Sequence, residues 1–74
     1  MVEVRIFGGL WKHLAPRLEL DLEGRELSVV DLIAHLDIDP SELGIVTVDG
    51  RQSNLDGTVP ADSRVCIFPP LLGG

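Results

Sequence analysis

The sequence predicts an α+β domain in which one main helix packs on one face of a sheet of four to five strands. Two patterns carry this prediction: apolar residues alternate with polar ones near the start of the chain, and an apolar stripe of helical period lies in its middle. A chain of 74 residues has room for one domain, and at this size folding removes only about 60% of the unfolded chain's surface from water. We therefore expect one thin core.

Five segments are expected as strands. The first two alternate between apolar and polar residues, and the last is apolar at every position, as in a strand at the middle of a sheet. The third runs into Asp49-Gly50, which favours a two-residue type I′ turn, so the fourth should return beside it. The expected strands cover residues 2–7, 18–22, 45–48, 51–53 and 65–68.

The main helix is expected over residues 29–36. Ser28 precedes it and Asp31 follows three residues later, which is an acidic variant of the capping box. Asp39-Pro40 ends the helical pattern. The apolar stripe consists of Val29, Leu32, Ile33 and Leu36. Between the first two strands, the spacing of Leu10 and Leu14 predicts a short turn or helix that closes before Pro16.

Charge and cysteine content exclude several classes of function. Twelve acidic and six basic residues give a net charge of −6, which repels phosphate backbones and argues against nucleic acid as a partner. This acidity suits an electropositive protein partner, or it serves solubility alone. The single Cys66 forms no internal disulfide and no leader opens the chain, so we expect a cytoplasmic protein. The longest apolar stretch, residues 65–72, is too short to span a bilayer, so no membrane partner is expected.

No catalytic, metal or cofactor site is expected inside the domain. Gly8-Gly9 lacks the spacing of a phosphate-binding loop and indicates a turn at the end of a strand. His13, His35 and Cys66 are too few and too scattered to form a metal site.

The C-terminal tail, residues 69–74, is the part of the chain that could carry chemistry. Pro69-Pro70 favours an extended polyproline II arm, and six residues at about 3.1 Å each reach roughly 18 Å. Leu71-Leu72 offers a partner an apolar contact, and Gly73-Gly74 can enter a channel that any side chain would block.

A carboxyl group that ends the chain, with a reference pKa of about 3.3 to 3.7, is an anion at neutral pH and can attack the α-phosphate of ATP. Adenylation turns it into a mixed anhydride that a sulfur nucleophile can attack. The alternative is that the two glycines are only a frayed end or an appended segment.

The segment Phe68-Pro69-Pro70-Leu71-Leu72-Gly73-Gly74, with the helix start at Ser28-Val29-Val30-Asp31-Leu32 and the turn Val48-Asp49-Gly50, resembles the MoaD and ThiS family of ubiquitin-like sulfur carriers. The Pro-Pro spacer is most similar to the molybdopterin synthase small subunit. This resemblance implies a ubiquitin-like β-grasp fold with parallel first and last strands at its centre. The chain departs from the family in the segment 8–17, which is short for the family's first helix.

The resemblance also implies a mechanism and its partners. An E1-like enzyme of the MoeB or ThiF kind would consume ATP to adenylate Gly74, and a sulfur donor would convert it to a thiocarboxylate. Gly73 with residues 69–72 would form the threaded arm, and a large synthase subunit like MoaE would receive the sulfur. The protein would then be a co-substrate with no catalytic site of its own. Three alternatives stay open: a carrier for thiamine or another pathway, a protein modifier joined to lysine through Gly74, and an interaction module without covalent chemistry.

Strand alternation also predicts a docking patch. If Val2, Val4 and Ile6 face the helix, Phe7 points to the opposite face of the sheet. The same rule puts Val46, Val48, Val65 and Ile67 inside and leaves Ile45, Thr47, Cys66 and Phe68 outside. We therefore expect an apolar patch of Phe7, Ile45 and Phe68 at the root of the tail, where a partner would bind.

Overall fold

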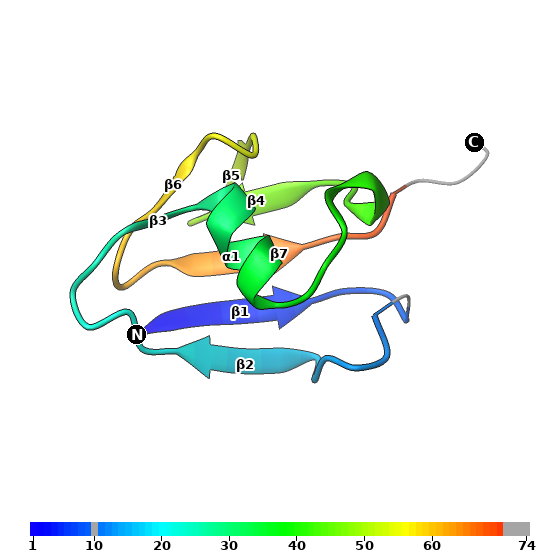
Figure 1. Ribbon diagram of the computed structural model, residues 1–74, viewed down its shortest axis with the longest axis horizontal. Coiled ribbons are helices and arrows are strands. Elements are labelled where there is room, and N and C mark those ends of the chain that lie inside the picture. The colour runs from blue at the N-terminus through cyan, green and yellow to red at the C-terminus, as the bar shows by residue number, and fades with distance from the viewer. Residues whose placement is uncertain (10, 71–74) are drawn as a thin grey trace.

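The computed structural model describes residues 1–9 and 11–70 (Figure 1). The predicted residues Leu71, Leu72, Gly73 and Gly74 lie outside this part of the chain, as does Leu10. The described elements are β1 (Val2–Ile6), β2 (Arg17–Leu20), β3 (Leu27–Ser28), α1 (Val29–His35), the 3-10 helix η1 (Pro40–Glu42), β4 (Val46–Val48), β5 (Arg51–Ser53), β6 (Thr58–Val59) and β7 (Arg64–Ile67).

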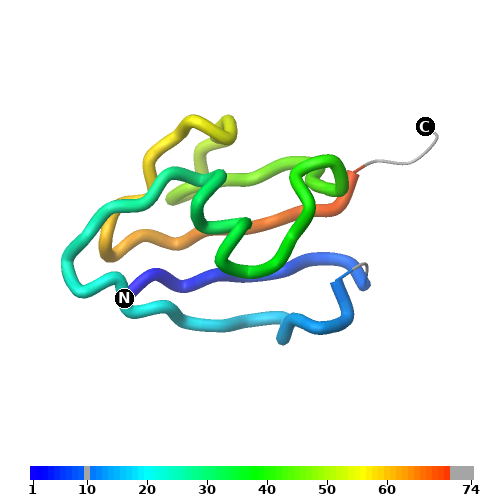
Figure 2. The backbone as a smooth tube through the Cα atoms, in the orientation of Figure 1, coloured from blue at the N-terminus to red at the C-terminus, as the bar shows by residue number. Residues whose placement is uncertain are grey.

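The main sheet has five strands in the order β2-β1-β7-β4-β5, and α1 covers one of its faces (Figure 1). β1 and β7 are parallel neighbours at the centre, as the resemblance implied, whereas the other neighbours are antiparallel. The tube in Figure 2 shows this pairing of the first and last strands. The short strands β3 and β6 form a second, two-stranded sheet. The prediction of one helix on a sheet of four to five strands is confirmed.

The core lies between α1 and the inner face of the sheet. The helix stripe and the inward residues of β1 and β7 are buried, as the periodicity predicted. Leu32 and Ile33 are fully buried, and burial of a side chain of this size stabilises the fold by about 1.5–3 kcal/mol. Three further core residues escaped prediction: Trp11, Ile38 and Val59.

The helix begins as predicted and ends one residue earlier than expected. The Ser28 hydroxyl accepts a hydrogen bond from the Asp31 amide at 3.2 Å. At the other end Asp37 has φ 59°, and its amide bonds to the Ala34 carbonyl while the Ile38 amide bonds to the Ile33 carbonyl. This is a Schellman motif, which ends the helix before Asp39-Pro40 and returns Ile38 to the core.

The strand boundaries differ from the predicted ones by one or two residues. β2 ends at Leu20 rather than at Leu22, because Leu20 pairs with Val2, the first residue of β1, and no partner strand continues beyond it. The turn at Asp49-Gly50 has φ 51° and 83°, so the predicted type I′ geometry is confirmed. Residues 8–9 and 11–16 form no helix, only turns.

Candidate functional site

Phe7 and Phe68 form a stacked aromatic pair on the face of the sheet that α1 leaves open. Each follows the last residue of its strand, and the Phe7 amide donates to the Ile67 carbonyl at 2.9 Å, which continues the parallel pairing of β1 and β7. The ring centroids lie 4.6 Å apart with an interplanar angle of 8°. Phe7 is 41% exposed and Phe68 is half-buried. The outward placement of both rings is therefore confirmed.

Ile45 lies beside this pair, immediately before β4. Its carbonyl accepts a hydrogen bond from the Phe68 amide at 2.8 Å, and its side chain is 40% exposed. We call Phe7, Ile45 and Phe68 the aromatic patch. An exposed group of large apolar side chains is the usual mark of an interface, but the docking role of this patch stays a prediction.

Two glycines enclose the root of the arm. Gly8 has φ +79°, and a Cβ added there would lie 2.8 Å from the Pro69 Cγ. On the other side, a Cβ added at Gly44 would collide with the Pro69 carbonyl. The Gly44 amide also donates to the Phe68 carbonyl at 3.0 Å. We call Gly8, Gly44 and Pro69 the glycine clasp. Pro69 can lie this close to positions 8 and 44 because the glycines there have no Cβ.

The clasp was missed by reasoning from the sequence. Gly8-Gly9 was interpreted as a turn at a strand end, which its positive φ confirms, but the contact with Pro69 depends on the parallel pairing of β1 and β7. No pattern in the sequence indicated that Gly44 would contact Pro69. Pro69 and Pro70 are half-buried, so the first two residues of the predicted arm lie against the domain.

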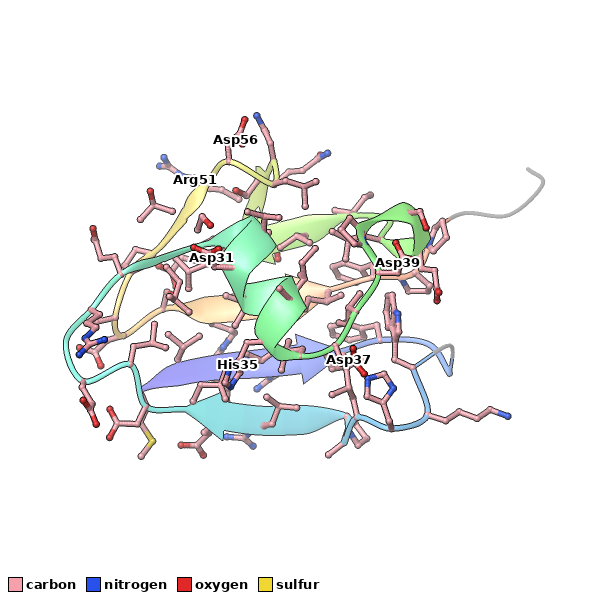
Figure 3. All side chains as sticks on the ribbon, in the orientation of Figure 1. Asp31, His35, Asp37, Asp39, Arg51 and Asp56 are labelled. Atoms are coloured by element: carbon pink, nitrogen blue, oxygen red, sulfur yellow. The ribbon has the colours of Figure 1, made fainter. Side chains whose placement is uncertain are left out.

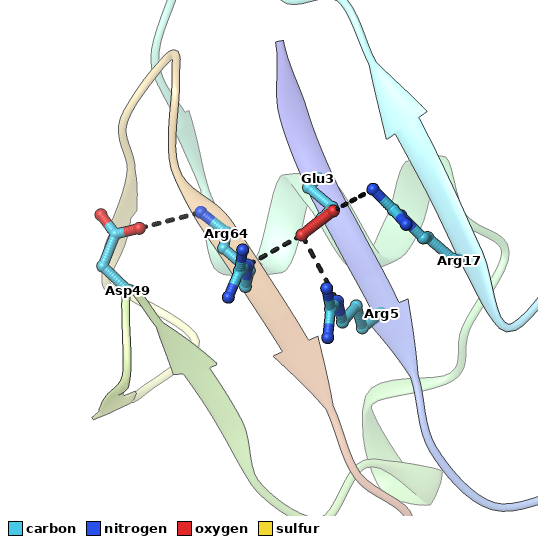
Figure 4. Close-up of polar contacts among 5 residues, drawn as sticks. All are labelled: Glu3, Arg5, Arg17, Asp49 and Arg64. Atoms are coloured by element: carbon cyan, nitrogen blue, oxygen red, sulfur yellow. Dashed lines mark hydrogen bonds and ion pairs between the residues drawn. The ribbon is translucent and has the colours of Figure 1, made fainter.

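A cluster of three arginines surrounds Glu3 on the same open face of the sheet (Figure 4). The Arg64 Nε lies 2.7 Å and the Arg5 Nε 3.3 Å from the Glu3 Oε1, and an Arg17 amino nitrogen lies 2.8 Å from its Oε2. The arginine side chains remain 40 to 63% exposed, whereas the Glu3 side chain is 19% exposed. The Arg5 Nε atom itself is buried and has no hydrogen-bond partner among the described residues. We call Arg5, Arg17 and Arg64 the arginine cluster.

The arginine cluster shifts the ionisation of Glu3. Partial burial opposes the charged form, but attraction by Arg17 and Arg5 and the hydrogen bond from Arg64 outweigh it and hold the pKa of Glu3 below its ordinary value. Further along this face, the Asp49 Oδ1 accepts a hydrogen bond from the Arg64 backbone amide at 2.9 Å. The net charge of the sequence does not reveal this cluster, because the three arginines come together only through the register of their strands.

Neither a metal centre nor a membrane span emerges from the described residues. Within residues 1–9 and 11–70, His, Cys, Asp and Glu side chains form no group of three suited to hold a metal ion. In the same part of the chain, no helix has the length and apolar character needed to cross a bilayer. Cys66, outward in β7, is free and half-buried.

Comparison with known proteins identifies the fold. No family model matches the sequence, and no curated protein matches it. The structure, however, matches the crystal structure of SAMP1 from Haloferax volcanii with a TM-score of 0.66, over 99% of this chain and 98% of that chain, at 21% sequence identity. The chain has a ubiquitin-like β-grasp fold. In this β-grasp domain the aromatic patch and the glycine clasp lie together where β7 passes into the arm.

Proposed function

We propose that this protein is a sulfur carrier whose Gly74 carboxylate is adenylated and then converted to a thiocarboxylate. The observation that carries the proposal is the position of the arm. Its root follows the central strand β7, is held by the glycine clasp and lies beside the aromatic patch. A partner that binds the patch would therefore receive the arm in a defined direction.

The reaction needs only the carboxylate of Gly74 from this chain. The carboxylate oxygen attacks the α-phosphate of ATP, which expels pyrophosphate and leaves an acyl adenylate. Sulfide then attacks the acyl carbon and expels AMP, which gives the thiocarboxylate directly. ATP is consumed by the activating partner. The proposal requires a free carboxyl group on Gly74, which the intact mass of the protein tests directly.

The proposed partners are an E1-like adenylating enzyme and a large synthase subunit that holds the sulfur acceptor. The resemblance of Pro69-Pro70 to the spacer of the molybdopterin synthase small subunit favours molybdopterin synthesis over thiazole formation. Activity with a large synthase subunit in molybdopterin formation, without activity in thiazole formation, is the expected outcome. The reverse result would assign the carrier to the thiamine pathway.

Intact mass spectrometry tests the proposal. After incubation with ATP, an E1-like enzyme and sulfide, the protein should gain the mass difference between sulfur and oxygen. Deletion of Gly74, or addition of one residue after it, should abolish the gain, because the shifted carboxylate no longer reaches the α-phosphate of ATP in the activating enzyme. Thermal unfolding should barely change, since terminal residues contribute little to a core. A deletion variant that still gains the sulfur would refute the proposal.

A protein modifier is the second candidate, because a ubiquitin-like fold and the same activation step would also serve conjugation of Gly74 to lysine. The two candidates differ in the nucleophile that attacks the adenylate. Peptide mapping that finds Gly73-Gly74 on lysine side chains of other proteins would favour the modifier.

A further inference from the structure

Basic side chains gather on the open face of this acidic protein. Three of the six basic residues form the arginine cluster on the open face of the sheet, where the paired strands β1, β2 and β7 also carry Glu3 and Glu19. The opposite side bears carboxylates on and around α1. Figure 3 shows Asp31, Asp37, Asp39 and Asp56 on that side, along with the basic residue Arg51. The net charge of −6 therefore does not describe the open face.

The arginine cluster has hydrogen-bonding capacity left over. Each guanidinium carries five N–H donors, but the one carboxylate of Glu3 receives all three ion pairs of the cluster. Among the described residues, Glu3 is the one carboxylate that forms ion pairs with these arginines, and their side chains stay 40 to 63% exposed. Arginine presents its donors in a rigid fork that matches a carboxylate in two hydrogen bonds. Glu3 therefore holds the three arginines in place without using up their donors.

The arginine cluster adjoins the aromatic patch. Arg5 precedes Phe7 by two residues on the same face of the β1 segment, and Arg5 pairs with Cys66, which precedes Phe68 by two. Two residues along a strand span about 7 Å. Beyond the cluster, the Asp49 carboxylate accepts a hydrogen bond from the Arg64 backbone amide, and Asp62 forms an ion pair with the N-terminal amine at 2.7 Å. The open face thus joins exposed apolar surface to three partly exposed arginine side chains that share one carboxylate in their ion pairs.

We infer that the open face of the sheet binds a protein surface in which apolar residues are bordered by carboxylates. The apolar part of that surface covers the aromatic patch, and its carboxylates bind the arginine cluster. Electrostatic attraction of this kind speeds association and weakens as salt screens it. This inference concerns the sheet face alone and does not depend on chemistry at Gly74.

A pair of peptides tests the inference. One soluble peptide alternates leucine with glutamate, and its counterpart carries lysine at every glutamate position. Net charge alone predicts that the acidic protein binds the lysine peptide. We expect the glutamate peptide to shift the amide resonances of residues 5, 7, 66 and 68 in NMR titrations, and its affinity to fall as salt rises from low to high concentration.

Neutral substitutions supply the matched control. The double variant Arg17→Gln/Arg64→Gln keeps Glu3 beside Arg5 and should weaken glutamate-peptide binding about three- to tenfold at low salt, in the range of exposed charge pairs at an interface. Arg51→Gln removes an exposed arginine from the strand β5, away from the cluster, and should change binding by less than about twofold.

Four results would overturn the inference: no shifts with the glutamate peptide, shifts confined to the helix side, tighter binding of the lysine peptide to the open face, or equal losses in the double variant and in Arg51→Gln. A protein truncated after Pro70 should bind the glutamate peptide normally. Because this truncation removes Gly74, it tests the sheet face apart from the arm. If the full-length protein binds the peptide but gains no thiocarboxylate, the proposed function is refuted and the inference stands.

Discussion

The substitution Gly44→Ala tests whether the glycine clasp sets the direction of the arm. The added Cβ would collide with the Pro69 carbonyl and would lie 2.8 Å from the Pro70 Cα. These are backbone atoms, so no side-chain rotation relieves the contact. Phe68 is held through both of its backbone groups, since its amide donates to the Ile45 carbonyl and its carbonyl accepts from the Gly44 amide. The chain is therefore expected to yield after Phe68, which swings the arm away from the clasp.

The expected cost in stability is modest and the cost in function is large. Overpacking costs about 1–3 kcal/mol, and because the arm can move we expect the lower end, about 1 kcal/mol. In a domain of this size that lowers the melting temperature by about 4–8 °C. A misplacement of about 1 Å at a reacting group can reduce a rate on the order of 100-fold. We therefore expect kcat/KM for adenylation to fall about 10- to 100-fold.

Gly9→Ala is the matched control. No atom lies within 4 Å of a Cβ added there, so its stability should stay within about 0.5 kcal/mol of wild type and its adenylation should be unchanged. Calorimetry and a pyrophosphate-release assay with the activating enzyme measure both effects. If Gly44→Ala melts and reacts like Gly9→Ala, the clasp does not position the arm and the reasoning fails.

Three further predictions address the patch, the helix and the arginine cluster. Phe68→Ala should weaken binding of the activating enzyme by at least about 2 kcal/mol while costing less stability than the buried control Ile67→Ala, for which about 2–5 kcal/mol is expected; calorimetry and binding isotherms that show the opposite order would place Phe68 in the core. Ser28→Ala should lower the unfolding free energy by about 1 kcal/mol through loss of the helix cap, and an unchanged urea midpoint would contradict that role. Because the folded pKa of Glu3 lies below its ordinary value of 4.5, its stabilising effect is present above pH 4.5 and is lost as pH falls through the lower folded value. At pH 7 the variant Glu3→Gln should therefore unfold at a lower urea concentration than wild type, and near pH 2 the two midpoints should converge. A difference in midpoint that does not depend on pH would refute the pairing.

Much of the fold could be predicted because its elements follow simple periods. The helix stripe and the alternating residues of β1 depend only on which positions face the core, and the turn at Asp49-Gly50 depends on positive φ at two residues. The two-residue strands β3 and β6 were beyond prediction, since two residues are too short to display a period. The burial of Trp11 and Ile38 depends on how loops fold back onto the core, which local patterns do not encode.

The candidate site was likewise predictable only in part. The outward placement of Phe7 and Phe68 follows from alternation along single strands, so it was predictable, but their stacking needed the parallel register of β1 and β7. The arginine cluster joins residues from three strands, and the negative net charge of the chain did not indicate a basic cluster. The reactive role of Gly74 was inferred from the tail residues and from the resemblance, and it stays a prediction.

The parallel pairing of β1 with β7 has a consequence for how the protein is made. Glu3 and Arg64 meet across 61 residues of sequence, so the centre of the sheet cannot assemble on the ribosome until almost all of the described chain has emerged. Contacts between such distant residues also slow folding, because a long loop must close first. A chain that stops before β7 therefore lacks the strand that carries the arm and also lacks the core that would hold it. Such a truncated chain would be cleared as an unfolded chain rather than compete for the activating enzyme.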